Sequence, residues 1–148
     1  MIDNDQKTIG EGDKRDTLTT LKNGVVAINT LGKTLGDLYL FLKGEPLYRG
    51  AAATSNATLF SVQSNRQYTV TEIDIANTSG SSQTYTIYLV PSGGTASASN
   101  ALFSAQTIAA NTTFQWKGAQ VVQAGGTIQG FASAVTVTFM ITGGRGSV

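Results

Sequence analysis

From about Thr54 onward the chain consists of short segments in which apolar and polar residues alternate. A period of two is typical of β-strands that bury one face. Gly, Pro, Asn and Ser separate the segments at the spacing of an antiparallel sandwich or small barrel. The predicted strands are residues 58–63, 67–77, 83–90, 101–108, 112–117, 119–123, 127–133 and 135–142. This set predicts a mainly β fold, an antiparallel β-sandwich with a jelly-roll-like pair of sheets.

Apolar side chains fall on one face of the clearest segments. On 83–90 these are Tyr85, Ile87 and Leu89, and on 135–142 they are Val135, Val137, Phe139 and Ile141. Aromatic residues are expected to supply much of the core volume. They are Phe60, Tyr85, Phe103, Phe114, Trp116, Phe131 and Phe139.

A different period precedes the strands. Asp16 or Thr17 can cap the start of a helix, and Gly44 followed by Pro46 can end it. Between them, apolar residues recur every three or four positions, as in a heptad seam with one gap at Gly32 and a second apolar row beside it. We predict an oligomer interface at Leu18, Leu21, Val25, Ile28, Leu31, Leu35, Leu38 and Leu42.

This apolar stripe could pack on its own domain or against other copies of the chain. Its glycines cost about 1 kcal/mol of helix propensity each, so the helix needs a partner surface. At about 1.5 Å per residue the stripe is about 40 Å long, more than a small sandwich covers comfortably. A wide seam favours three or more helices, so the sequence predicts a homo-oligomer, a trimer in particular.

The predicted organisation follows from these patterns and from charge. Charged residues crowd the first sixteen positions, whereas from Gly50 onward they are Arg66, Glu72, Asp74, Lys117 and Arg145. We predict an anchoring arm (1–16), an oligomerisation helix (17–44), a linker (45–57), a β-sandwich (58–143) and a flexible tail (144–148).

The composition excludes many kinds of chemistry. The chain has no cysteine and no histidine, which removes thiolate nucleophiles, zinc-thiolate sites and the commonest general base and metal ligand. A net charge of +1 gives no field that would attract nucleic acid, and Lys33 and Asp37 interrupt the most apolar window, 25–42. We therefore expect no enzyme activity, no catalytic, cofactor-binding or metal-binding residues, and neither nucleic acid nor a membrane as partner.

Glu72 and Asp74 are the carboxylates of the predicted sandwich, and they share one strand face opposite Ile73 and Ile75. A glycosidase pair or a calcium site is conceivable there. A solvent-facing pair on a strand whose other face is core is the simpler interpretation, and we adopt it.

Several runs resemble a known class of proteins. TLFSVQSNRQYTVTEIDIANTSGSSQTYTIYLVPSGG, ALFSAQTIAANTTFQW, VVQAGGTIQGFAS and VTFMITG are similar to the β-sandwich accessory proteins of tailed-bacteriophage virions. These include head-decoration (cement) proteins, head fibres and small neck or tail-fibre components. The run LKNGVVAINTLGKTLGDL likewise resembles N-terminal helices of phage structural proteins.

The resemblance implies a non-enzymatic virion structural protein, assembled in the bacterial cytoplasm and often trimeric. Its partners would be other copies of itself and capsid, neck or tail proteins. Capsid decoration or a head fibre is the favoured role, with neck or tail-fibre attachment as the alternative. A carbohydrate-binding adhesin module, whose loops 91–100 and 124–126 touch host glycans, is a further alternative, and a glycan hydrolase is a remote one.

Overall fold

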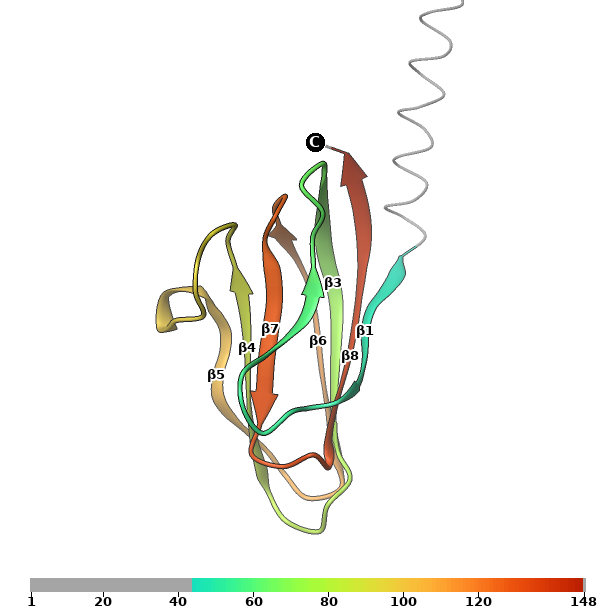
Figure 1. Ribbon diagram of the computed structural model, residues 1–148. Coiled ribbons are helices and arrows are strands. Elements are labelled where there is room, and N and C mark those ends of the chain that lie inside the picture. Colours follow the sequence, from blue (N-terminus) through green and yellow to red (C-terminus); the bar gives the residue numbers. More distant parts are fainter. Residues whose placement is uncertain (1–43, 148) are drawn as a thin grey trace, which may run out of the picture. The chain divides into compact units, whose positions relative to one another are not determined.

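The computed structural model describes residues 44–147, which form two antiparallel four-stranded sheets (Figure 1). The strands are β1 (Glu45–Ala51), β2 (Ala57–Ser61), β3 (Arg66–Asn77), β4 (Gln83–Val90), β5 (Ala101–Ile108), β6 (Thr112–Val122), β7 (Thr127–Ala132) and β8 (Val137–Ser147), with a short 3-10 helix η1 (Ala98–Asn100) before β5. The predicted β-sandwich is confirmed. The predicted arm, and the predicted helix up to residue 43, lie outside the described residues.

The strand order shows how the two sheets are connected. One sheet runs β1-β8-β3-β6 and the other β2-β7-β4-β5. Strands of the first half pair with strands of the second in reverse order, β1 with β8, β2 with β7, β3 with β6 and β4 with β5, all antiparallel. A long hairpin of four strand pairs folded over itself in this way is a jelly roll.

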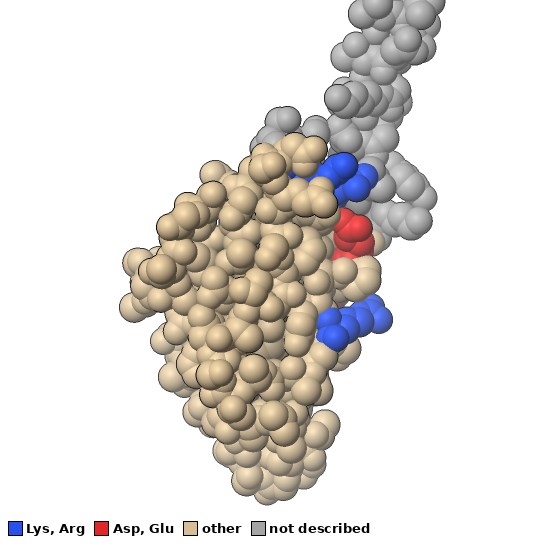
Figure 2. Space-filling view, viewed as in Figure 1, with Lys and Arg blue, Asp and Glu red and all other residues tan. Residues whose placement is uncertain are grey.

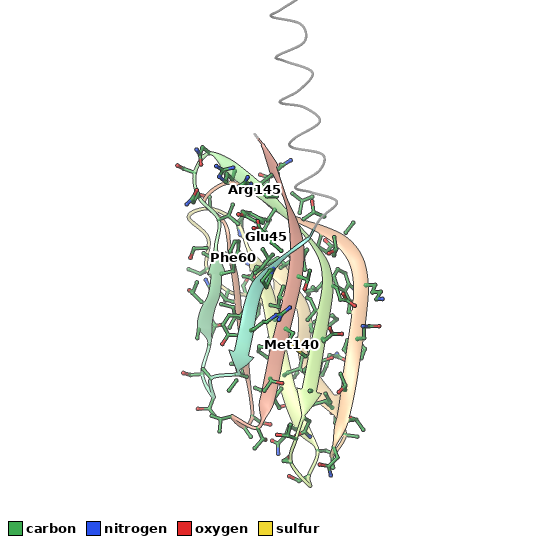
Figure 3. The ribbon with its side chains drawn as sticks, turned by 90° about the vertical axis from the view of Figure 1, so that its right-hand side faces the viewer. Glu45, Phe60, Met140 and Arg145 are labelled. Atoms are coloured by element: carbon green, nitrogen blue, oxygen red, sulfur yellow. The ribbon has the colours of Figure 1, made fainter. Side chains whose placement is uncertain are left out.

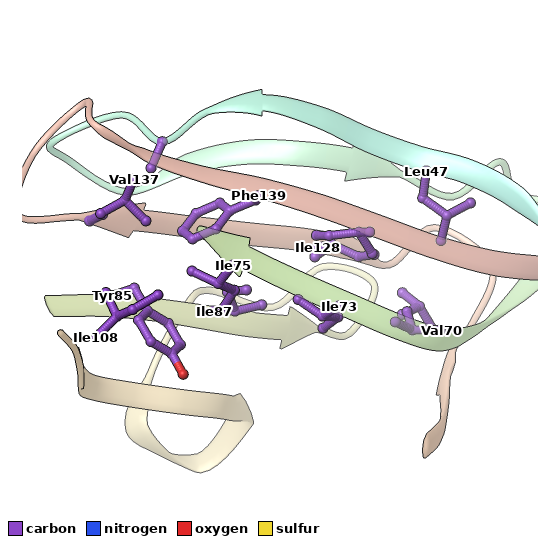
Figure 4. Close-up of a cluster of buried hydrophobic side chains, with 14 of the residues drawn as sticks. Leu47, Val70, Ile73, Ile75, Tyr85, Ile87, Ile108, Ile128, Val137 and Phe139 are labelled. Atoms are coloured by element: carbon purple, nitrogen blue, oxygen red, sulfur yellow. The ribbon is translucent and has the colours of Figure 1, made fainter. Parts of the chain in front are cut away.

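The core lies between the sheets and follows the alternation of the strands (Figure 4). On β8, Val137, Phe139 and Ile141 are fully buried, and Ile73 and Ile75 of β3 lie beside them in register. The facing sheet supplies further buried side chains, among them Tyr85, Ile87, Ile108, Ile128 and Ala132. Burial at about 25 cal/mol per Å² of apolar area makes this cluster the main stabilising contact of the sandwich.

Three predicted boundaries were wrong. The predicted linker 45–57 contains β1, a strand at the edge of its sheet, where Pro46 is tolerated because an edge amide needs no partner. The predicted tail 144–148 contains the end of β8, whose glycines pair with β3. Segments 112–117 and 119–123 are one strand, β6, whose register shifts near Gly118.

Some predicted core residues also lie elsewhere. Val135 precedes β8 and is 62% exposed, and Phe114 is 39% exposed. Phe131 alternates with the buried Gly130 and Ala132, so its side chain lies on the outer face of its sheet. The sandwich is therefore packed tightly in the middle and along β8, and less tightly at β6.

Asn77, at the end of β3, joins three parts of the chain at one end of the sandwich. Its side-chain amide donates to the carbonyls of Ser81 (2.8 Å), Ile108 (3.3 Å) and Ala109 (3.1 Å). Its Oδ1 accepts from the backbone amide (3.0 Å) and the hydroxyl (2.8 Å) of Ser79. Asn77 is only 2% exposed, so these bonds replace water for a buried polar group.

Candidate functional site

Glu72 and Asp74 lie where the sequence placed them, on the outer face of β3 opposite the buried Ile73 and Ile75. Gln115 of β6 donates its side-chain amide to both carboxylates, at 2.7 Å to Glu72 and 3.0 Å to Asp74. Lys117 adds an ion pair to Glu72 at 3.5 Å. The two carboxylates are thus part of a polar row between β3 and β6.

The predicted interface residues, from Leu18 to Leu42, lie outside the described residues, so the structure does not place them. Within residues 44–147, no three His, Cys, Asp or Glu side chains gather where they could hold a metal ion. In the same residues, no helix is long and apolar enough to cross a membrane.

Charge is confined to one of the two sheets. Every charged residue from 44 to 147 belongs to a strand of the β1-β8-β3-β6 sheet: Glu45, Arg49, Arg66, Glu72, Asp74, Lys117 and Arg145. Figure 2 shows the opposite side, over the β2-β7-β4-β5 sheet, without a charged side chain, and the coloured groups lie along the β1 and β8 side. The uncharged sheet presents mainly Thr, Ser, Gln and aromatic side chains. Such a surface loses little hydration when another protein covers it.

The two sheets are less closely joined where their edge strands β5 and β6 lie. Phe114 and Trp116 of β6 point toward Phe103 of β5, with ring centroids 5.7 Å and 6.3 Å from the ring of Phe103. Tyr85 completes the cluster, 5.7 Å from Phe103 and 6.1 Å from Phe114. The three pairs that involve Phe103 are edge-to-face, a favoured geometry for aromatic rings, whereas the rings of Tyr85 and Phe114 are tilted by 34°. Because Phe114 is 39% exposed, this cluster reaches the surface instead of being sealed inside.

Trp116 is the single tryptophan of the chain, and its ring lies over the backbone of Gly118. A Cβ atom added to Gly118 would stand 2.3 Å from Cζ2 of the indole, so any larger residue would displace the ring. Gly118, which separated the two strands predicted at 112–117 and 119–123, therefore leaves room for the indole of Trp116 at this edge.

A shallow groove of about 410 Å³ borders the same edge. Leu89, Pro91, Leu102 and Val121 line it together with Ser99, Asn100, Ala101 and Gln120. The segment 91–100 beside it is held by its own bonds, since the Asn100 side chain accepts from the amide of Ser97 (3.0 Å) and donates to the carbonyl of Thr95 (2.8 Å). Gly125 of the 123–126 turn approaches Ser92, so the two loops of the adhesin hypothesis lie side by side.

A polar cluster marks the opposite edge, where β1 begins. Figure 3 shows Glu45 and Arg145 toward one end of the sandwich near Phe60, and Met140 in the middle of the outer face. Tyr68 packs edge-on against Phe60, with ring centroids 4.9 Å apart. Burial raises the pKa of Tyr68, and the negative charge of Glu45 raises this pKa further. The hydroxyl of Tyr68 therefore stays protonated to a higher pH than that of an exposed tyrosine.

Comparison with known proteins gives no family. No protein-family model and no curated protein matches the chain. The fold is similar to part of the structure of infectious bursal disease virus Gx strain, with a TM-score of 0.41 and 15% identity over 69% of this chain and 30% of that chain. For the Gt strain the TM-score is 0.36 and the identity 14%, over 70% of this chain and 31% of that chain. The chain thus spans about a third of those viral chains, and a likeness this low assigns no role to any residue.

The sequence alone did not point to the β5–β6 edge. Its aromatic residues were assigned to a closed core, and Gly118 split β6 into two short strands. The order Phe114, Gln115, Trp116, Lys117 is the ordinary alternation of a strand that is buried on one face and solvated on the other, so the sequence contains no signal for an open edge.

Proposed function

We propose that this chain is a structural protein that works by attachment, binding other copies of itself and other proteins of a virion, and that it has no enzymatic activity. The observation that carries the proposal is the uncharged β2-β7-β4-β5 sheet, next to an edge where aromatic residues reach the surface. Interface cores are depleted in charged residues because burying an unpaired charge costs several kcal/mol. Lys and Glu on the outer face of the β2-β7-β4-β5 sheet would make a free monomer more soluble, and this sheet contains neither.

The place of attachment is proposed from the resemblance to phage accessory proteins. As a decoration or cement protein, the sandwich would bind across capsid subunits with its uncharged face, and as a head fibre it would project from them. The arm (1–16) would anchor the chain, and the apolar stripe from Leu18 to Leu42, called the leucine stripe below, would oligomerise it. A trimer is the expected state. Neck or tail-fibre attachment is the alternative location.

Quantitative mass spectrometry of purified particles tests this proposal. We expect the chain to be present in particles, in a copy number comparable to that of the capsid protein if it decorates the head. A copy number far below that of the capsid protein would move it to the neck or tail. Absence from particles would contradict the virion role.

A second candidate function is binding of host glycans. The groove beside 91–100 favours it, because Asn100 and Gln120 offer polar groups next to the apolar Leu102 and Val121. Sugar sites combine such polar groups with apolar surface. Binding of the full chain to a glycan array would support an adhesin, and a flat array at high protein concentration would exclude it.

A further inference from the structure

The outer strand β6 has the properties of a strand that pairs with another chain. It is eleven residues long and, among the described residues, its one strand partner is β3. The other side of β6 therefore presents backbone amides and carbonyls to any strand that approaches. Charges, prolines and short length normally protect such edges. β6 contains no proline and one charged residue, Lys117, so beyond the register shift near Gly118 it has little protection.

The inner face of this edge is apolar. Phe114 and Trp116 alternate along β6 and face Phe103, and Phe114 remains 39% exposed. A strand added to β6 would extend the sheet and cover these rings from the side. The edge thus offers main-chain hydrogen bonds and aromatic surface together, the combination that strand addition uses.

We infer that β6 pairs antiparallel with β6 of a second copy of this chain, about a two-fold axis at Trp116, so that two four-stranded sheets become one continuous sheet. The inference deepens the proposed function, on which it rests for the expectation that the chain self-associates. It names the surface through which two copies meet outside the leucine stripe.

The register follows from the rules of antiparallel pairing. Residues directly opposite one another place their side chains on the same face. With Trp116 on the axis, Lys117 lies opposite the partner's Gln115 on the outer face, and Phe114 lies opposite the partner's Gly118 on the inner face. The indole of the partner's Trp116 covers that glycine, as it does within one copy, so Phe114 would pack against an aromatic ring.

Charge complementarity argues for a second copy as the occupant. Gln115 holds Glu72 and Asp74 at 2.7 Å and 3.0 Å, so a pair of carboxylates stands behind it. Lys117 lies 3.5 Å from Glu72 of its own chain, but its side chain is 69% exposed, so it can also extend across the strand gap toward the corresponding pair on the other copy. The two-fold axis makes this contact twice, because each copy supplies both the cation and the carboxylates. A strand of unrelated sequence would not supply both.

The absence of cysteine from the chain allows a direct test by cross-linking. Two variants of the full chain, Gln115→Cys and Lys117→Cys, are mixed in equal amounts and oxidised at low concentration. Directly opposite Cβ atoms are about 5 Å apart and diagonal ones about 7–8 Å, so the mixture should give about tenfold more disulfide between unlike chains than between like chains. Mass spectrometry distinguishes the products. A mixture of Gln115→Cys with Thr107→Cys, on the outer face of β5, serves as the control.

A second measurement needs no substitution. Emission from Trp116, the single tryptophan, should shift to shorter wavelength as the concentration of the wild-type chain rises, because pairing removes water from the indole. Melting curves of the cysteine variants check that they fold as the wild type does.

The outcomes separate this inference from the proposed function. If unlike and like chains cross-link equally, or if the mixture gives no more disulfide than the control, pairing through β6 is wrong. If light scattering nevertheless shows an oligomer, the proposed function is retained and only the pairing through β6 is abandoned. A full chain that stays monomeric and forms no specific disulfide would contradict both.

Discussion

Replacing Asn77 with aspartate is expected to lower the free energy of unfolding by about 4 kcal/mol at neutral pH, although the two side chains have nearly the same shape. The amide group of Asn77 donates to three carbonyls, those of Ser81, Ile108 and Ala109. A carboxylate has no donor, so the three carbonyls would face a negative charge in a site that is only 2% exposed. Urea unfolding followed by the fluorescence of Trp116 measures the loss.

The free energy of unfolding of the Asn77→Asp variant should depend on pH in a defined direction. Burial beside carbonyl oxygens raises the pKa of the new carboxyl group above its value in the unfolded chain. A raised folded-state pKa means that the penalty is greatest above that pKa and declines as the pH falls through it, toward the pKa of the unfolded state. The stability difference from wild type should therefore shrink in acid.

Asn56→Asp provides the matched control. Asn56 is exposed, and its amide donates to the side chain of Gln129 at 2.7 Å. The same chemical change at this position should cost less than about 1 kcal/mol, because water replaces the lost donor. Equal losses in the two variants would show that the bonds of Asn77 are not what holds this end of the sandwich.

The central strands could be predicted from the sequence because their alternation is regular. β4 and most of β8 place Tyr85, Ile87, Phe139 and Ile141 in the core, as the period of two required. Each of these strands is paired on both sides, so one face is buried along its length and the pattern is not disturbed. The exposed position of Val135 belongs to the turn before β8.

The edges and strand ends could not be predicted, because there the residue types reflect contacts that a single sequence does not reveal. Gly143 was predicted as the last residue of the sandwich, directly before a flexible tail (144–148). In the structure it lies between β1 and β3, and a Cβ atom there would stand 2.5 Å from the carbonyl oxygen of Thr69 and 2.8 Å from Leu47. Glycine is needed for close packing at this position, not for flexibility.

The sequence predicted part of the candidate site. The pair Glu72 and Asp74 lies on the solvent-facing side of β3, as the alternation of that strand predicted. Their contact with Gln115 joins residues more than forty positions apart, and only the pairing of β3 with β6 brings these residues together. The open β5–β6 edge was not predicted, because strand alternation identifies the face that a side chain occupies but not how far two sheets separate at their margin.

Replacing Leu35 with aspartate is expected to abolish association through the leucine stripe, the largest effect on assembly that the sequence predicts. Leu35 is a member of the predicted seam, which lies outside the described residues, and an unpaired charge in an apolar seam costs several kcal/mol. Light scattering of the full chain should show the wild-type mass fall, on dilution, to that of one 15.4 kDa chain. The β-sheet signal in far-ultraviolet circular dichroism should be unchanged, because the sandwich has its own core.

Thr34→Asp is the matched control for this prediction, since Thr34 is the neighbouring position and is not part of the stripe. It should retain the wild-type mass, because a charge outside the seam stays in water at little cost.

Two surfaces of self-association also predict an intermediate. At high concentration Leu35→Asp should remain a dimer through β6, and adding Lys117→Glu should reduce the fraction of that dimer. A Leu35→Asp chain that keeps the full wild-type mass after dilution would mean that the stripe is covered within one chain, and attachment would then depend on the sandwich alone.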